Sequence, residues 1–293
     1  MPELGSSSCK RKVLVMKCKL VALLSIVASL CAALVLFSGC SAPGTDDSGA
    51  KSLKVGVVAG PYQDLFREAV EPSLRERGYS VSYVEFSDYV QPNNALVNGD
   101  ISLNVFQHST YLNSFAQQHG LDLAALAEIP TAAMGVFSNK VGSLDQLSEG
   151  ATVAVPNDDT NLSRSLRVLQ QAGLVFLDSA VDPAKATVDD IASNPKNIVI
   201  KQVNAEILPT VLDSVDAAVV NGNYAIGAGL DLADAAYMEQ LSEGYYNVIA
   251  VRGEDAAAPF AQDIVAIVGS DAFRRAIEDP SRPFSAFSRP SGY

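Results

Sequence analysis

An apolar segment near the start of the chain limits how much of this protein can join a water-soluble fold. The segment from Met16 to Cys40 begins with two lysines, is apolar over residues 20–37, and ends on Ser-Gly-Cys. Positive charge, an apolar core and small residues before a cleavage point are typical of a secretory signal that is removed from the mature protein. We therefore predict that residues 1–39 are a signal peptide and that the protein works outside the cytoplasm.

The last three residues of this segment, Ser38-Gly39-Cys40, resemble a bacterial lipobox. In such a motif the cysteine is acylated and becomes the first residue of the mature protein, so Cys40 is the expected lipidation site. A single uncleaved transmembrane anchor is the alternative, because about 20 apolar residues can span a bilayer. The lipobox interpretation places the protein on the extracytoplasmic face of the cell membrane, held there by lipid.

Cysteine usage agrees with this interpretation. All four cysteines lie within the first 40 residues: Cys9, Cys18, Cys31 and Cys40. Cleavage before Cys40 leaves one cysteine, and that residue carries the lipid. The mature chain is therefore expected to have no disulfide, no thiol nucleophile and no metal bound through cysteine.

The charge of the mature chain argues against nucleic acid as a partner. Residues 1–39 contain five Lys or Arg residues and one Glu, so the remainder has a formal net charge of −16, against −12 for the whole chain. Polyanions and anionic membrane surfaces repel such a body. Attachment to the membrane is therefore expected through the acyl chain rather than through the protein surface.

After the signal, residues 40–52 are rich in Ser, Gly, Asp and Ala and are predicted to form a lipidated flexible tether. From Leu53 onward, strand and helix patterns alternate, which is typical of α/β layering. Strands are expected at 53–58, 80–86, 101–106, 132–138, 152–155, 198–203, 217–220 and 246–252. Helices are expected at 63–77, 92–98, 144–147, 161–172, 188–193, 205–212 and 259–277.

The length of the folded part favours two lobes, because about 240 residues exceed the usual size of one small domain. We expect the first lobe to comprise residues 53–137 and 246–293, and the second to comprise residues 138–245. The Pro- and Ser-rich stretch 281–291 is expected to be a loose tail.

Polar and aromatic residues gather where predicted strands end. Phe106, His108 and Tyr111 lie between a strand and the following helix. This junction, at the carboxyl end of a strand, is where open α/β sheets bind ligands. A single histidine is more often a structural hydrogen-bonding group, so that alternative stays open for His108.

Three further candidates follow the same pattern. Arg164 lies in the first turn of a helix that follows a polar loop, where an anion is favoured and where arginine can bind a carboxylate. Asn221 follows an apolar strand, and Asn247 begins another. Taken singly, Arg164 is better explained as a surface residue of a capped helix, and each asparagine as a turn or cap residue.

The combination and order of these segments resemble the NlpA family of lipoproteins, the substrate-binding components of methionine ABC transporters. The resemblance extends over residues 53–268. The matching segments are Lys54-Val-Gly-Val-Val-Ala-Gly60, Asp88-Tyr-Val-Gln-Pro-Asn93, Phe106-Gln-His108, Val155-Pro-Asn-Asp158, Asn161-Leu-Ser-Arg164, Asn221-Gly-Asn-Tyr-Ala225 and Asn247.

This resemblance implies a two-lobed α/β fold of the periplasmic-binding-protein type, with a ligand cleft between the lobes. It implies that the protein captures L-methionine and delivers it to the permease and ATPase subunits of an ABC importer. Some family members take D-methionine, methionine derivatives or short methionine peptides. The residues that match the family's site are Tyr89, Phe106, Tyr111 and His108 around the thioether, Arg164 at the carboxylate, and Asn221 and Asn247 at the ligand's backbone-like end.

Two other classes of function would be compatible with a secreted, lipid-anchored chain. An extracytoplasmic enzyme is disfavoured because the mature chain has no cysteine nucleophile, has only two histidines, and lacks Gly-x-Ser-x-Gly and phosphate-binding glycine loops. We therefore expect no catalytic residue, cofactor or metal. The remaining alternative is a lipid-anchored surface protein that binds a methionine derivative or short peptide without a role in transport.

Overall fold

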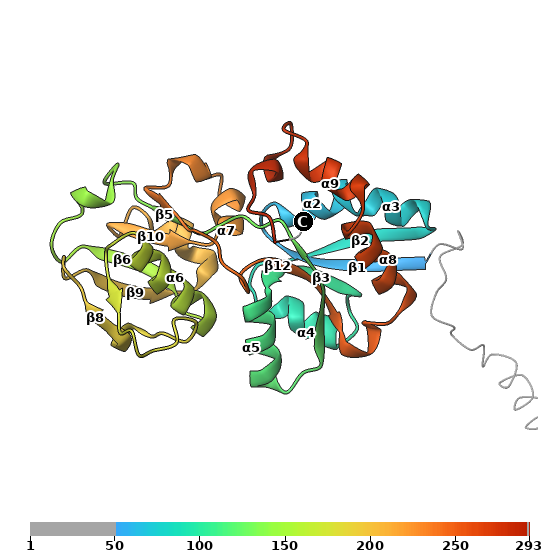
Figure 1. Cartoon of the computed structure of the whole chain (residues 1–293), viewed down its shortest axis with the longest axis horizontal. Coiled ribbons are helices and arrows are strands. Elements are labelled where there is room, and N and C mark those ends of the chain that lie inside the picture. The colour runs from blue at the N-terminus through green and yellow to red at the C-terminus, as the bar shows by residue number, and fades with distance from the viewer. Residues whose placement is uncertain (1–50, 292) are drawn as a thin grey trace, which may run out of the picture. The chain divides into compact units, whose positions relative to one another are not determined.

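The computed structural model describes residues 51–291 and 293 (Figure 1). The predicted signal peptide, most of the predicted tether and the lipidation site Cys40 lie outside the described residues. The described chain contains two five-stranded sheets, each with its own helices, and we call these two parts the first and second lobes. The α/β organisation expected from the sequence is confirmed.

The first lobe is built on a sheet with the strand order β2-β1-β3-β12-β4. Strand β1 is parallel to β2 and β3, whereas β12 is antiparallel to β3 and β4. Its strands are β1 (Lys51–Val58), β2 (Tyr79–Phe86), β3 (Leu103–His108), β4 (Leu123–Ile129) and β12 (Asn247–Arg252). Its helices are α2 (Tyr62–Ala69), α3 (Glu71–Glu76), α4 (Gln91–Val97), α5 (Ser109–His119), α8 (Pro259–Val268) and α9 (Asp271–Glu278), with 3-10 turns η5 (Gly253–Asp255) and η6 (Pro283–Ala286).

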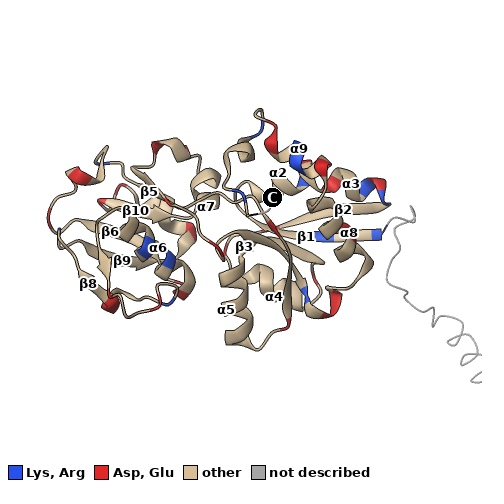
Figure 2. Ribbon diagram, viewed as in Figure 1, with Lys and Arg blue, Asp and Glu red and all other residues tan. Residues whose placement is uncertain are grey.

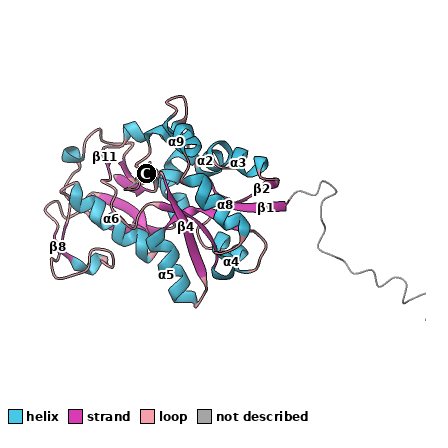
Figure 3. Cartoon of the chain, turned by 45° about the vertical axis from the view of Figure 1, so that its right-hand side comes forward, coloured by secondary structure: helices cyan, strands magenta, loops and turns pink. Residues whose placement is uncertain are grey.

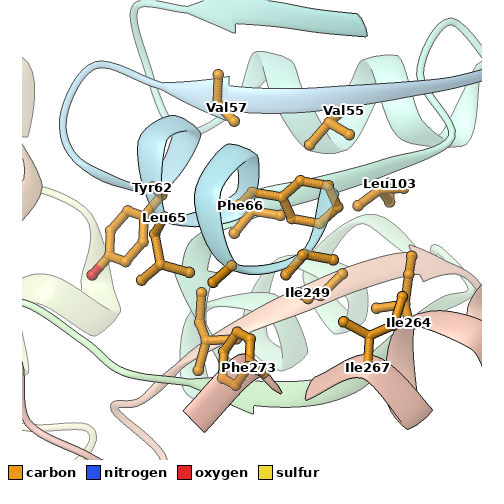
Figure 4. Close-up of a cluster of buried hydrophobic side chains, with 14 of the residues drawn as sticks. Val55, Val57, Tyr62, Leu65, Phe66, Leu103, Ile249, Ile264, Ile267 and Phe273 are labelled. Atoms are coloured by element: carbon orange, nitrogen blue, oxygen red, sulfur yellow. The ribbon is translucent and has the colours of Figure 1, made fainter. Parts of the chain in front are cut away.

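Helices cover both faces of this sheet, which explains its almost wholly apolar strands. Along β12, Ile249 and Val251 pack with α2, α8 and α9 in one core, shown in Figure 4. The alternate residues Val248 and Ala250 pack with α4 and α5 in another. Because successive side chains of a strand point to opposite faces, a strand covered on both sides must be apolar throughout.

The second lobe is built on a sheet with the strand order β11-β5-β10-β6-β9. Its strands are β5 (Gly135–Phe137), β6 (Thr152–Pro156), β9 (Val199–Val203), β10 (Ala217–Val220) and β11 (Tyr237–Met238), and a separate pair is formed by β7 (Phe176–Leu177) and β8 (Ile191–Ser193). Its helices are α6 (Asp159–Gln171) and α7 (Gly222–Gly227), with 3-10 turns η1 (Leu144–Gln146), η2 (Val188–Asp190), η3 (Ala205–Val211) and η4 (Leu232–Asp234).

The chain crosses between the lobes twice, and the first crossing comes earlier than the sequence analysis placed the boundary. Val136 of β5 pairs with Val219 of β10 and with Tyr237 of β11, so residues 135–137 belong to the second sheet rather than to the first lobe. The first crossing therefore lies between β4 and β5, and the second between β11 and β12. A single apolar strand carries no local signal of which sheet it joins.

Two long predicted helices are each divided in the structure. The helix expected at 63–77 breaks at Val70, because Pro72 lies in the first turn of α3 and has no backbone N–H to continue α2. The helix expected at 259–277 breaks before Ser270, whose hydroxyl accepts from the N–H of Phe273 and caps α9. The helix expected at 188–193 is a short 3-10 turn followed by β8.

The C-terminal segment is packed, and the expectation of a loose tail at 281–291 was wrong. Phe284 is 1% exposed and Phe287 is 7% exposed, and both belong to the core of the first lobe. Thr131 and Ser288 exchange two backbone hydrogen bonds, of 2.9 and 3.1 Å. The prediction failed because it relied on the Pro- and Ser-rich composition and gave no weight to these two phenylalanines.

No helix in residues 51–291 is long and apolar enough to cross a membrane.

Truncating the buried anchor of this segment should destabilise the protein. We expect Phe284→Ala to lower the free energy of unfolding by about 3 to 5 kcal/mol, because it removes a fully buried aromatic ring and leaves a cavity. Phe176→Ala is the matched control: this ring is 45% exposed, and its loss should cost less than about 1 kcal/mol. Urea denaturation of the body from Ser41 onward measures both values, and equal losses would contradict the packing described for Phe284.

Candidate ligand-binding site

A cavity of about 320 Å³ lies between the two lobes. All seven residues proposed from the sequence line it: Tyr89, Phe106, His108, Tyr111, Arg164, Asn221 and Asn247. The structure thus brings together side chains that are up to 158 positions apart in the sequence. Their contacts to a ligand stay predictions. Six further lining residues were not proposed: Tyr62, Gln107, Ala132, Asn161, Gly222 and Asn223.

The first lobe supplies an aromatic wall. The ring of Tyr89 stacks on that of Phe106, with centroids 5.7 Å apart, and meets that of Tyr111 edge-on at 5.9 Å. The hydroxyl of Tyr111 donates to the carbonyl oxygen of Tyr89 at 3.2 Å, which fixes the two rings relative to each other. Burial raises the pKa of Tyr89 well above its ordinary value, so the wall is uncharged.

His108 is held by its position at the junction between β3 and α5. It is the N-cap residue of α5, and its Nδ1 accepts from the N–H of Tyr111 at 3.0 Å. Its Nε2 lies 3.3 Å from Oδ1 of Asn161, so Nε2 is the nitrogen that carries the proton. Burial, together with the positive charge of Arg164, lowers the pKa of His108 to about 3. The ring therefore enters the site neutral, as a structural hydrogen-bonding group.

The second lobe supplies the charged wall, through helix α6 (Figure 2). The Asp158 carboxylate caps this helix by accepting from the N–H of Asn161. One turn further on is Arg164, which is 4% exposed. In Figure 3, α6 lies beside α5 of the first lobe, and Gln118 of α5 donates to Asp159 at 3.3 Å.

Arg164 is not the surface residue that its local sequence favoured, because it is buried and paired with Glu239. Its Nε donates to Oε1 at 2.8 Å and its Nη2 donates to Oε2 at 2.6 Å, and both side chains are 4% exposed. Burial alone would lower the pKa of Arg164, but the Glu239 carboxylate raises it above its ordinary value. Glu239 follows β11 directly, and no local pattern in the sequence marked it.

A chain of amide groups links the two walls. Nδ2 of Asn161 donates to both carboxylate oxygens of Asp158 at 3.0 Å. Its Oδ1 accepts from Nδ2 of Asn221 at 2.9 Å, in addition to its contact with His108. Asn161 belongs to the segment Asn161-Leu-Ser-Arg164 that the sequence analysis singled out, so its position in the motif was the signal that pointed to it.

Asn221 lines the cavity, and its amide oxygen has no hydrogen-bond partner among the described residues. Within residues 51–291 and 293 this buried Oδ1 accepts no hydrogen bond. A buried acceptor left unsatisfied costs about 1 to 3 kcal/mol, so it favours an occupant that brings an N–H or O–H donor. Asn247 approaches from the opposite lobe, where its Nδ2 donates to the carbonyl oxygen of Phe106 at 3.0 Å.

Hydrogen bonds across the lobe boundary close the cavity at one side. The hydroxyl of Tyr89 donates to Oδ1 of Asn223 at 2.7 Å, and Nδ2 of Asn223 donates to the carbonyl oxygen of Ala59 at 3.1 Å. Gly60 has a φ of +127°, and a Cβ there would lie 2.5 Å from the Asn223 carbonyl oxygen. This close approach therefore requires glycine.

The groups that line the cavity indicate the kind of molecule that it can hold. Among the described residues, no group of three or more His, Cys, Asp or Glu side chains is placed to hold a metal ion. What the cavity offers is one paired guanidinium, one unpartnered amide oxygen and an aromatic wall. Such a site suits a small molecule with an anionic group, a hydrogen-bond donor and an apolar part.

The sequence of this chain is similar to those of known lipoproteins. Residues 53–285 match the model of the family described as NlpA lipoprotein. The D-methionine-binding lipoprotein MetQ of Escherichia coli K12 is 38% identical over 231 residues, which is 78% of this chain and 85% of that protein.

Solved structures of binding proteins are similar to this one in fold and in sequence. A nutrient-binding protein from Burkholderia cenocepacia bound to methionine is 40% identical, with a TM-score of 0.73 over 78% of this chain and 95% of that one. The substrate-binding protein of a methionine transporter from Streptococcus pneumoniae is 33% identical, with a TM-score of 0.71 over 78% and 93%. These likenesses confirm the two-lobed α/β fold expected from the sequence, and the chain belongs to the NlpA lipoprotein family.

Proposed function

We propose that this protein captures free methionine outside the cytoplasm and delivers it to an ABC importer. The observation that carries the proposal is that one cavity is lined both by a guanidinium with N–H groups left over from its pairing with Glu239 and by Asn221, whose Oδ1 has no partner. A free amino acid has a carboxylate for the first and an ammonium group for the second. Support also comes from relatives that are named as methionine-binding proteins.

In this proposal the ligand carboxylate binds Arg164. Nε and Nη2 of the guanidinium each donate one N–H to Glu239, so both N–H groups of Nη1 and the second N–H of Nη2 remain for the ligand. The ammonium group donates to Oδ1 of Asn221, with Asn247 at the same end of the ligand. A desolvated carboxylate or ammonium group needs such partners, because burial without them costs several kcal/mol.

The thioether chain then lies against the aromatic wall of the first lobe. Tyr89, Phe106 and Tyr111 offer ring faces and edges, and sulfur beside an aromatic ring gains about 0.3 to 1.5 kcal/mol. His108 contributes a neutral ring next to them. A charged side chain on the ligand would find no counter-charge at this wall, which favours methionine over basic or acidic amino acids.

Binding is proposed to hold the two lobes together without any chemical step. The ligand would contact Phe106 and Asn247 on one lobe and Arg164 and Asn221 on the other, so the closed arrangement is stabilised when the ligand is present. In this proposal the transporter recognises the closed, ligand-bound form of the protein. We therefore propose a binding protein rather than an enzyme, with permease and ATPase subunits as its partners.

Attachment to the membrane is proposed to depend on Cys40. Removal of residues 1–39 leaves this cysteine at the N-terminus, followed by 10 residues before β1 begins at Lys51. An acyl chain there would hold the acidic body near the extracytoplasmic face of the membrane. The alternative function, a surface protein that binds a methionine derivative or short peptide, predicts ligand binding with no effect of gene deletion on methionine uptake.

The ligand can be identified by thermal unfolding of the body from Ser41 onward, after unfolding and refolding to strip any bound molecule. Each of the twenty amino acids and D-methionine is tested separately. We expect methionine at 100 times its dissociation constant to add about 2.7 kcal/mol of stability and so raise the midpoint visibly. A refolded protein whose midpoint no amino acid raises would contradict the proposed function.

The role of Asn221 can be tested with Asn221→Leu, which keeps a similar shape and removes the amide oxygen. We expect the affinity for methionine to fall by about 1.5 to 3 kcal/mol, the usual contribution of a hydrogen bond to a charged group. Asn139→Leu is the matched control, because Asn139 is exposed and donates to Asp213. Calorimetric titration measures both variants, and a variant at position 221 that binds like the control would rule out this contact.

Lipid attachment can be tested in cells with Cys40→Ser. We expect the variant to leave the membrane fraction while its soluble body binds methionine as the parent does, because every residue that lines the cavity comes after Cys40 in the sequence. Fractionation followed by immunoblotting measures the distribution. A variant that stays in the membrane would instead favour an uncleaved transmembrane anchor.

A further inference from the structure

Glu239 is a buried carboxylate next to the cavity whose role the proposed function does not yet explain. It does not line the cavity, yet it makes both of its side-chain ion-pair contacts with Arg164, which does. Its effect on an occupant must therefore act through Arg164 and through its own electric field. A charge inside a protein acts over several ångströms with little screening.

The position of this carboxylate is firmly set. The N–H of Glu239 donates to the carbonyl oxygen of Met134 at 2.9 Å, and Oε2 accepts from the N–H of Met134, also at 2.9 Å. These contacts continue the antiparallel pairing of β5 with β11, where Met238 lies opposite Gly135. Met134 is fully buried. Two of the four described hydrogen bonds of Glu239 are thus made to backbone of the first crossing, and the other two to the guanidinium.

The pair has no net charge, and this limits what the cavity accepts. One positive and one negative group cancel, so an occupant with a net charge would leave that charge uncompensated in a buried site. A zwitterion adds one charge of each sign and preserves the balance. Without Glu239, the lone guanidinium would favour any carboxylate, whether or not the molecule also carried an ammonium group.

We propose that Glu239 is a specificity-determining residue that restricts the cavity to zwitterionic amino acids. The inference rests on the proposed function, in which methionine binds as a free amino acid. Glu239 does this by offsetting the attraction of Arg164 for simple carboxylic acids and by adding attraction for the ligand ammonium group. It also holds the guanidinium by Nε and Nη2, which fixes the edge formed by Nη1 and Nη2 as the one that faces the ligand carboxylate.

The proposal predicts opposite effects on two charged analogues. At about pH 6, methionine is a zwitterion, 4-(methylthio)butanoate lacks the amine and is an anion, and methionine amide lacks the carboxylate and is a cation. In Glu239→Gln the site gains one positive charge. We expect the anion to gain about tenfold in affinity relative to methionine, and the cation to lose about tenfold relative to methionine.

Competitive calorimetric titration of the three compounds on the body from Ser41 onward measures these ratios. A purely structural role for Glu239 would weaken all three compounds by the same factor, and equal factors would overturn the proposal. Glu76→Gln is the matched control, because it removes the same charge from an exposed position on α3 and should leave both ratios unchanged. If the parent protein itself does not bind methionine, it is the proposed function that fails.

A second comparison covers the case in which Glu239→Gln does not fold. Arg164→Gln leaves Glu239 in place, whereas the double variant Arg164→Gln, Glu239→Gln carries neither charge and keeps the buried balance. The affinity for methionine amide relative to methionine should be about tenfold higher in the single variant than in the double variant. Equal ratios in the two variants would show that the charge of Glu239 does not act on the ligand, and would overturn the proposal.

Discussion

The buried ion pair between Arg164 and Glu239 is the interaction on which the arrangement of the site depends. Two charged groups at 4% exposure are tolerated only because each satisfies the other at 2.6 and 2.8 Å. The pair ties α6 to the end of β11, where the chain leaves the second lobe. Tyr245, on the same crossing, has its ring 5.3 Å from the Arg164 guanidinium and 5.0 Å from the ring of His108. Through Tyr245, the Arg164 guanidinium of the second lobe is linked to His108 of the first.

Around this pair the two lobes present different kinds of side chain to the cavity. The first lobe presents aromatic rings from β3, α5 and the loop that carries Tyr89, all fixed by stacking and by the N-cap contact of His108. The second presents amides and a charge at the start of α6 and at the end of β10. In the proposed function, the separation of apolar and polar groups onto different lobes would make ligand affinity depend on closure.

Local patterns in the sequence were sufficient for some features and not for others. Alternating apolar strands and amphipathic helices predicted most elements of both sheets, because each pattern reflects burial on one or two faces. Phe106 became a candidate because it lies at a strand–helix junction, where sites form, and Arg164 became one chiefly through the family resemblance. The tail at 281–291 was mispredicted because two phenylalanines among prolines and serines have no periodicity. Glu239 was missed because nothing near it in the sequence distinguishes it from an exposed glutamate.

The sequence by itself determined the secretory signal pattern, the α/β class and a set of seven candidate site residues, all of which line one cavity. These properties follow from local composition, from periodicity and from the order of short motifs. Only the tertiary structure decided which sheet residues 135–137 join, that Arg164 is already paired, and that Asn221 keeps an unpartnered oxygen. Each of these depends on which distant groups come within hydrogen-bonding distance after folding, and contacts between residues as far apart as 164 and 239 leave no local trace in the chain.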